Sequence, residues 1–371
     1  MKCKSVVYKF NNEWLNRVDL KYSFASKFNS KTGFYLRTNV IKDGVETKEE
    51  PFMASFPHLI DVGVMGHCVH GKTGLCVKAG IECYQSGLHI NKPNMKVEDF
   101  EKIATECEGL IDQIALGGRG DPDCHEEFET LLKICKNHHI VPNYTTSGLL
   151  MNEEKARLTK EYCGAVAVSW YRSDYTYKAI DLFLKAGVKT NIHYVVDNNS
   201  IDEAINRLNT NDFPKGINAI VFLLFKPVGQ GQQRNKLIIN DPRIKEFFDA
   251  VAKKHPFKIG FDSCFVPGVI NNMKNVDLNT VDTCEGARYS MYISSDMVAV
   301  PCSFDQSQKY AFDIKEKDIN DAWNSKEFEE FRKSLRYSCP SCNKRSYCMG
   351  GCPLVKDIVL CELKEDILQE N

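Results

Sequence analysis

The residues with the clearest chemical potential form a cysteine run, Cys339-Pro-Ser-Cys342-Asn-Lys-Arg-Ser-Tyr-Cys348-Met-Gly-Gly-Cys352, and Cys361 follows it. Packing does not explain so dense a set of thiols, which are therefore expected to bind metal or to form disulfides. Disulfides persist in oxidising compartments. The chain opens without an apolar signal region, which predicts a reducing, cytoplasmic location. Metal binding is therefore the favoured interpretation.

A second group of three cysteines follows a β-rich run at residues 58–65. These are Cys68, Cys76 and Cys83, with seven and six residues between them. Three thiolates can hold three irons of a four-iron cluster and leave the fourth iron open to a small molecule. On spacing alone, a structural zinc site with His67 or His70 as fourth ligand is an equal alternative.

A glycine-rich turn follows the next β-rich run, at residues 111–116. Its sequence is Gly117-Gly118-Arg119-Gly120-Asp121-Pro122. Glycines allow a ligand to approach the backbone closely, and the carboxylate of Asp121 could bind an amino group. Taken alone, such a turn is more often only a turn.

Composition limits the classes of function that remain open. The 371 residues are 43% hydrophobic and 26% charged, which predicts an ordinary globular chain with more than one folding unit. The longest apolar run, at residues 219–225, is too short to span a bilayer, so no membrane association is expected. The formal net charge is -1 and basic runs are absent from the sequence, so stable nucleic-acid binding is not expected either.

The elements that position these residues follow an alternating pattern. Short β-rich runs alternate with amphipathic helices between residues 58 and 260, which is typical of a parallel α/β sheet. The predicted strands are 58–65, 111–116, 140–145, 165–169, 188–196 and 217–225. Six strand-helix units predict a partial, laterally open (β/α)6 barrel of the TIM type, with its sites at the C-terminal ends of the strands.

The regions on either side of this barrel have a different character. Residues 1–57 are polar with few periodic segments and are interpreted as an N-terminal extension. Residues 261–371 carry the second cysteine set, short strands at 289–294 and 298–302, and a helix at 321–335. The remaining cysteines are interpreted as core or surface residues: Cys3, Cys107, Cys124, Cys135 and Cys163.

The three-cysteine loop and the glycine-rich turn together resemble the radical S-adenosylmethionine (SAM) superfamily. Further similarities lie at residues 145–148, 166–169 and 225–231, at the ends of predicted strands three, four and six. The resemblance implies that the loop cysteines bind a [4Fe-4S] cluster whose open iron is chelated by SAM. Reductive cleavage of SAM then yields a 5'-deoxyadenosyl radical that abstracts hydrogen from a substrate. The SAM contacts that the resemblance implies are Gly117, Gly118, Asp121, Ser169 and Arg172.

This chain departs from the family pattern in two places. The family's common loop has three and then two residues between its cysteines, and its turn usually carries Glu where this chain has Asp121. Arg172 is as plausibly a surface salt-bridge partner as a contact to the SAM carboxylate.

The cysteines from residue 264 onward resemble the SPASM domain, a two-cluster extension of radical SAM enzymes that modify peptides and proteins. The resemblance implies one cluster near the barrel, held by Cys264, Cys284, Cys302 and Cys352. It implies an outer cluster held by Cys339, Cys342, Cys348 and Cys361. With the SAM-binding cluster the expected total is three, and a pair of zinc sites is the alternative.

The resulting expectation is radical chemistry on a peptide or protein side chain: a crosslink, an oxidation or an epimerisation. A one-electron donor such as flavodoxin or ferredoxin is the expected redox partner. Sulfatase-maturing relatives carry Asp where this chain has Ser303, which disfavours that activity. The alternatives are radical SAM chemistry on a small metabolite or nucleotide, and a zinc-stabilised binding protein. The N-terminal extension is expected to bind a leader peptide, to cap the barrel, or to have only a structural role.

Overall fold

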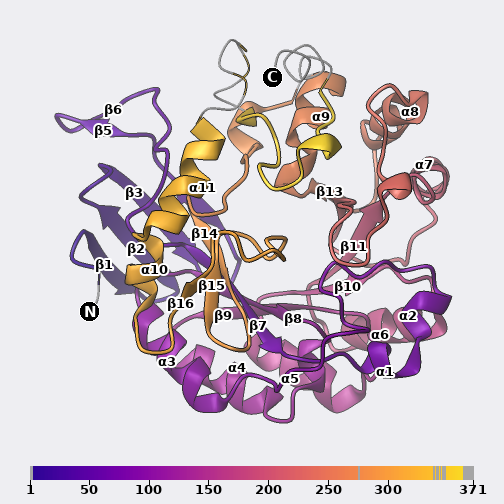
Figure 1. Cartoon of the computed structure of the whole chain (residues 1–371), viewed down its shortest axis with the longest axis horizontal. Coiled ribbons are helices and arrows are strands. Elements are labelled where there is room, and N and C mark those ends of the chain that lie inside the picture. The colour runs from indigo at the N-terminus through magenta and orange to yellow at the C-terminus, as the bar shows by residue number, and fades with distance from the viewer. Residues whose placement is uncertain are drawn as a thin grey trace.

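The computed structural model of the chain describes residues 3–274, 276–336, 339, 342, 344 and 348–361. Its centre is a sheet with the strand order β13-β12-β11-β10-β9-β8-β7-β14-β15-β16. In Figure 1 this sheet curves around the molecule with α3 to α6 on its outer side, while the N-terminal strands lie across from α7 and α8.

The six predicted barrel strands are all present and all parallel. They are β7 (Leu59–Met65), β8 (Gln113–Gly118), β9 (Val141–Thr146), β10 (Val166–Ser169), β11 (Thr190–Val196) and β12 (Ala219–Leu224). A further parallel strand, β13 (Lys258–Phe261), pairs with β12 and lengthens the open edge. The predicted partial barrel is therefore confirmed and extended by one strand.

Amphipathic helices cover the outer face of the barrel sheet. They are α3 (Val97–Cys107), α4 (Phe128–Asn137), α5 (Glu153–Tyr162), α6 (Asp174–Lys185), α7 (Ile201–Thr210) and α8 (Pro242–Val251). Helix α8 shows how the sequence sets a helix start, because Asp241 accepts a hydrogen bond from the Arg243 N–H and Pro242 occupies the first turn. Cys107 and Cys135 are fully buried on the apolar faces of α3 and α4, as predicted.

The N-terminal residues form an antiparallel sheet that the sequence did not predict. Its strands are β1 (Val6–Asn11), β2 (Trp14–Asp19), β3 (Phe24–Asn29) and β4 (Tyr35–Arg37), followed by the hairpin of β5 (Ile41–Lys42) and β6 (Val45–Glu46). The buried positions of this sheet include Arg17, Asp19, Ser26 and Asn29. Because these side chains are polar, the alternation that identifies a half-buried strand is hidden in the sequence.

The C-terminal region continues the barrel sheet. Strand β14 (Ser290–Ile293) pairs in parallel with β7, and β15 (Val298–Val300) and β16 (Phe312–Asp313) follow in antiparallel order. The predicted helix 321–335 is two helices, α10 (Ile319–Trp323) and α11 (Lys326–Arg336), so that prediction is wrong in this detail. The break is stabilised because the Arg332 guanidinium donates to the Trp323 carbonyl at 2.6 Å.

The remaining helical segments are short. They are α1 (Val69–Thr73), α2 (Leu75–Lys78), η1 (Pro122–Cys124), η2 (Gln233–Asn235), η3 (Ser263–Phe265), α9 (Val266–Asn272), η4 (Leu278–Thr280) and η5 (Lys356–Ile358). One hydrophobic core runs through the barrel and the C-terminal region, from Ile60 and Phe222 to Trp323 and Phe331. None of the helices in the described part of the chain has both the length and the apolarity that a bilayer span requires.

Candidate metal centres and ligand site

The three loop cysteines gather beyond the C-terminal end of β7. Cys68 directly precedes α1, Cys76 lies buried on α2, and Cys83 follows these two helical turns. A Cβ added at Gly87 would lie 3.1 Å from the Cys68 Cβ and 3.6 Å from the Cys83 Sγ. The Gly87 N–H donates to the Cys83 Sγ at 3.4 Å. The extra residues of the long loop are thus folded into α1 and α2, and the thiols remain neighbours. Their role as a ligand set stays a prediction.

Burial keeps these thiols protonated as long as no metal ion is bound. Burial raises the pKa of the Cys68 thiol to about 11, and the nearby Asp121 and Cys83 contribute to the rise. Burial also raises the pKa of Cys76, again with a contribution from Cys83. Such thiols stay protonated at neutral pH and lose their protons when a metal ion binds, because the ion offsets their mutual repulsion.

The glycine-rich turn after β8 leaves open space at Gly117, and at Gly118 it has a backbone conformation with positive φ. A Cβ at Gly117 would meet no described atom within 4 Å, so the space beside it is open. Gly118 has φ 115°, and a Cβ there would lie 2.5 Å from the Met65 carbonyl oxygen. Gly117 therefore fits a ligand contact, whereas Gly118 is needed for the close approach of β7 and β8.

Asp121 is held by a network that joins three loops. The Ser147 N–H donates to the Asp121 Oδ1 at 2.9 Å, and the Ser147 hydroxyl donates to Oδ2. The His70 Nε2 lies 2.5 Å from the Ser147 Oγ and 3.8 Å from the Asp121 Oδ2. When Asp121 is ionised, the Ser147 proton goes to its carboxylate, and His70 is then the donor to Ser147. The cysteine loop, the glycine-rich turn and the end of β9 are therefore locked together.

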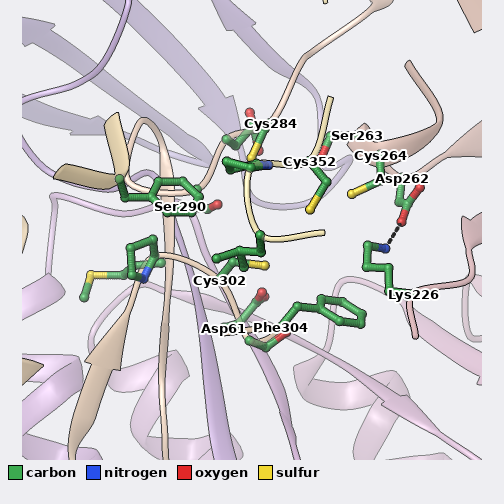
Figure 2. A pocket seen from close by; sticks show the side chains of 18 of the residues that line it. Asp61, Lys226, Asp262, Ser263, Cys264, Cys284, Ser290, Cys302, Phe304 and Cys352 are labelled. Carbon is green, nitrogen blue, oxygen red and sulfur yellow. Dashed lines mark hydrogen bonds and ion pairs between the residues drawn. The ribbon is translucent and has the colours of Figure 1, made fainter. Parts of the chain in front are cut away.

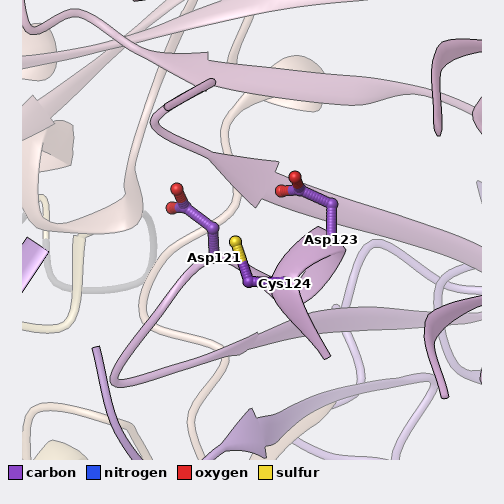
Figure 3. Close-up of side chains that lie close together, drawn as sticks. All are labelled: Asp121, Asp123 and Cys124. Carbon is purple, nitrogen blue, oxygen red and sulfur yellow. The ribbon is translucent and has the colours of Figure 1, made fainter. Parts of the chain in front are cut away.

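Two further side chains lie beside Asp121 in η1. Figure 3 shows Asp121, Asp123 and Cys124 close together, and their oxygen and sulfur atoms lie within 4.8 Å of one another. The Asp123 Oδ2 accepts a hydrogen bond from Lys155 at 3.2 Å, so that carboxylate already has a cationic partner. Burial, followed by the charge of Asp123, raises the pKa of Asp121 to about 7. Asp121 is thus the carboxylate of this pair that is suited to bind an amino group.

The residues predicted at the end of strand four have different surroundings. Ser169 ends β10 beside His193 of β11. The Arg172 Nε donates to the Glu203 carboxylate on α7, and its guanidinium lies 5.3 Å from the centre of the Tyr194 ring. Arg172 therefore forms the salt bridge that was its alternative role. Contacts of Ser169 and Arg172 with SAM stay predictions.

Four of the C-terminal cysteines line one cavity of about 380 Å³ between the barrel and β14. They are Cys264, Cys284, Cys302 and Cys352, and Figure 2 shows them around this space. These are the four residues of the predicted inner set, whose role as cluster ligands stays a prediction. Cys264 and Cys352 share a hydrogen bond, which raises the pKa of Cys264 and lowers that of Cys352. Burial raises the pKa of Cys284 to about 12, with a contribution from Cys264.

The other four cysteines form a separate group. Burial raises the pKa of Cys348, and the thiols of Cys361, Cys339 and Cys342 contribute to this rise because they lie nearby. Backbone N–H groups of Lys344 and Gly350 donate to the sulfur atoms of Cys342 and Cys348, each at 3.4 Å. The structure therefore brings together the predicted outer set, and its role as a ligand set stays a prediction.

Both groups of four fit an iron-sulfur cluster. Sulfur donors suit iron-sulfur clusters and zinc alike, so the donor type alone does not separate the two. The cavity at the inner set adds volume between the thiols, which a cluster would fill and a single ion would not. The inner set therefore favours a cluster.

The sequence alone did not reveal the roles of four residues that contribute to these sites. Ser147 and Lys226 lie within motifs that carry the family resemblance, at residues 145–148 and 225–231, but their side chains were given no role. His70 was weighed as a zinc ligand, whereas the structure joins its Nε2 to Ser147. Asp61, which lines the inner cavity from β7, has no sequence signal because it is a single polar residue in an apolar strand.

Comparison with known proteins agrees with this arrangement. Residues 284–345 match the family model of SPASM, described as an iron-sulfur cluster-binding domain. No protein of curated function matches the chain by sequence. Among solved structures, Streptococcus suis SuiB bound to S-adenosylmethionine has a TM-score of 0.66 at 14% identity, covering 98% of this chain and 100% of that chain. SuiB bound to the precursor peptide SuiA has a TM-score of 0.66 at 15% identity, covering 96% and 100%. Native anSMEcpe with bound AdoMet has a TM-score of 0.58 at 18% identity, covering 84% and 96%.

These findings define the fold. The chain has the fold of the radical SAM enzymes that carry a C-terminal SPASM domain, as the resemblance predicted. The match to the SPASM family contains two cysteines of the inner group, Cys284 and Cys302. It also contains two of the outer group, Cys339 and Cys342.

Proposed function

We propose that this protein cleaves SAM reductively to a 5'-deoxyadenosyl radical and uses the radical to abstract hydrogen from a peptide or protein. One observation carries the proposal. The three-thiol loop, the open face of Gly117 and the carboxylate of Asp121 converge at the C-terminal ends of β7 and β8. This is the end of the barrel at which ligands bind in folds of this kind.

The chain's own residues have distinct parts in this proposal. Cys68, Cys76 and Cys83 would hold a [4Fe-4S] cluster, which would supply the electron needed to cleave bound SAM. Asp121, oriented by Ser147, would accept a hydrogen bond from the SAM amino group. The inner and outer cysteine groups would hold two auxiliary clusters, which makes three in total.

The division of the chain follows from the same proposal. Residues 1–57 are the N-terminal extension, residues 58–260 the radical SAM barrel, and residues 261–371 the SPASM domain. We place the protein in the cytoplasm, where a flavodoxin or ferredoxin would supply single electrons.

A peptide substrate is supported by two of the structural neighbours. SuiB has been crystallised with its precursor peptide SuiA, and anSMEcpe with the Cp18Cys peptide. The reaction in this chain would be a crosslink, an oxidation or an epimerisation of a side chain. If the substrate were a small metabolite or a nucleotide, the mass change would instead be found in that small molecule, and no peptide would be needed for the reaction.

The test is anaerobic reconstitution followed by iron and product analysis. Three clusters predict about twelve irons per chain, and reduced protein should release 5'-deoxyadenosine from SAM. Replacement of the three loop cysteines by Ala should remove about four irons and all 5'-deoxyadenosine. Cys163→Ala, outside the predicted ligand sets, is the matched control and should keep both. Equal product from wild type and the triple variant would refute the proposal.

A further inference from the structure

A lysine is buried beside the inner cysteine group. Lys226 follows β12 and is only 6% exposed. Its Nζ donates to the Asp262 Oδ2 at 2.8 Å and to the Leu224 carbonyl at 3.0 Å, and it lies 4.3 Å from the centre of the Phe304 ring. Removing an ammonium group from water is costly unless partners compensate for the lost hydration. The position of this cation is therefore fixed by several contacts.

The contacts of Lys226 belong to segments that carry the inner thiols. Asp262 lies two residues before Cys264, and Phe304 lies two residues after Cys302. The Asp262 Oδ1 also accepts from the N–H of Phe265 at 3.2 Å, which holds the carboxylate in place. Figure 2 shows the Lys226 and Asp262 pair at the same cavity as the four cysteines.

The Lys226 ammonium keeps its charge at the cavity of the inner thiols. Burial alone would lower the pKa of Lys226, but Asp262 and Cys264 raise it well above its usual range, so the ammonium persists. Lys226 acts to lower the pKa of both Cys264 and Cys302, against the larger effect of burial. Asp262 acts in the opposite sense on Cys264. The Lys226 ammonium lies at the cavity wall in contact with Asp262 and Phe304, whose segments carry Cys264 and Cys302.

We propose that Lys226 is a positioning residue that raises the reduction potential of the cluster held by the inner thiols, and that Asp262 moderates this effect. The inference rests on the proposed function, which supplies the cluster. A four-iron core with four thiolates is an anion and becomes more negative on reduction. A fixed cation nearby therefore stabilises the reduced state more than the oxidised state.

The test is an anaerobic redox titration of the full-length, reconstituted protein, followed by electron paramagnetic resonance. Signals that change when SAM is added belong to the SAM-binding cluster, and the remaining signals belong to the auxiliary clusters. Lys226→Met should shift one SAM-insensitive midpoint to a more negative potential, and Lys226→Arg should restore it. Asp262→Asn keeps the cation and removes its counter-charge, so the same midpoint should shift to a more positive potential. Lys236→Met removes a more exposed lysine that is paired with Asp357. This control variant should leave the midpoint potential unchanged.

The opposite directions of the midpoint shifts in Lys226→Met and Asp262→Asn separate an electrostatic role of Lys226 from a merely structural one. Unshifted midpoints, or shifts in the same direction for Lys226→Met and Asp262→Asn, would overturn the inference. If Lys226→Met fails to assemble the cluster, Lys226→Arg and Asp262→Asn decide the matter by the same criterion. A wild-type protein with iron for one cluster only would instead refute the proposed cluster set, a result that the iron content reveals before any titration.

Discussion

At the scale of single residues, Asp121 combines two opposing influences. Burial and the neighbouring Asp123 favour its protonated form, while two hydrogen bonds from Ser147 favour the carboxylate. The net effect is a pKa of about 7 in the ligand-free protein. An amino group placed beside Asp121 would favour the carboxylate further. Ligand affinity should therefore depend on pH in the range where the protein works.

We expect SAM affinity to rise by about tenfold between pH 6 and pH 8, because Asp121 ionises across its raised pKa and only the carboxylate accepts fully from the amino group. Asp121→Asn should bind SAM more weakly and lose most of this pH dependence. Equilibrium dialysis of the reconstituted protein at several pH values would measure both. Asp181→Asn, which changes an exposed carboxylate paired with Lys185, is the control and should keep the wild-type profile.

At the scale of elements, the junction between the barrel and the C-terminal region depends on one glycine. A Cβ at Gly63 of β7 would lie 2.1 Å from the hydroxyl oxygen of Tyr292 on β14. The register of β7 with β8 also shifts between Val62 and Met65. The Tyr292 side chain of β14 thus packs against the backbone of β7 at a position where only glycine leaves room for it.

Gly63→Ala should destabilise the protein by about 1–3 kcal/mol, because the added methyl group forces Tyr292 and β14 to move. Gly117→Ala adds the same methyl group where no described atom lies within 4 Å, so its stability should match wild type. Urea unfolding compares the two variants. The same Gly117→Ala protein should bind SAM more weakly, since its methyl group enters the proposed ligand space. Normal SAM binding by this variant would remove Gly117 from the site.

The N-terminal sheet is attached to the barrel by a buried ion pair. The Arg17 guanidinium donates to the Asp112 Oδ2 at 2.6 Å and to the Leu110 carbonyl at 2.7 Å. Both side chains are at most 5% exposed. The pair thus connects β2 with the segment that leads into β8.

Arg17→Met should cost about 3–5 kcal/mol of stability, because it leaves the Asp112 carboxylate buried without its cation. Arg157→Met removes an exposed partner of Glu161 and should cost less than about 1 kcal/mol. Thermal unfolding and limited proteolysis of residues 1–57 would report the difference. Equal stability of the two variants would show that the sheet is held by apolar contacts alone.

Elements formed by interactions between residues close in the sequence could be predicted, whereas those formed by contacts between distant segments could not. The barrel strands and helices were predicted because their periodicity is local and apolar. The N-terminal sheet was not, since its buried face carries Arg17 and Asp19. The pairing of β14 with β7 joins segments more than 200 residues apart, and neither strand alone encodes it. The cysteine grouping was predicted from the family resemblance, whereas Lys226 was missed because its burial depends on tertiary contacts.

At the scale of the whole molecule, the three cysteine groups lie in one continuous structure. The inner group shares its cavity wall with Asp61 of β7, and Tyr84, next to Cys83, stacks on Phe304 with ring centres 4.2 Å apart. The four outer thiols lie near one another and do not line this cavity. Loss of the outer group should therefore affect the barrel less than loss of the inner group.

Cys348→Ala tests this separation, because it removes one outer thiol and leaves the barrel loop, Gly117 and Asp121 intact. We expect the variant to lose about four irons and still cleave SAM to 5'-deoxyadenosine. Modification of a peptide should fall sharply, since the local fold around an auxiliary cluster depends on its ligands. Both products would be followed in one anaerobic time course, with circular dichroism to confirm the α/β content and Cys163→Ala as the control. A parallel loss of both activities in a folded barrel would show that the outer group is not a separable module.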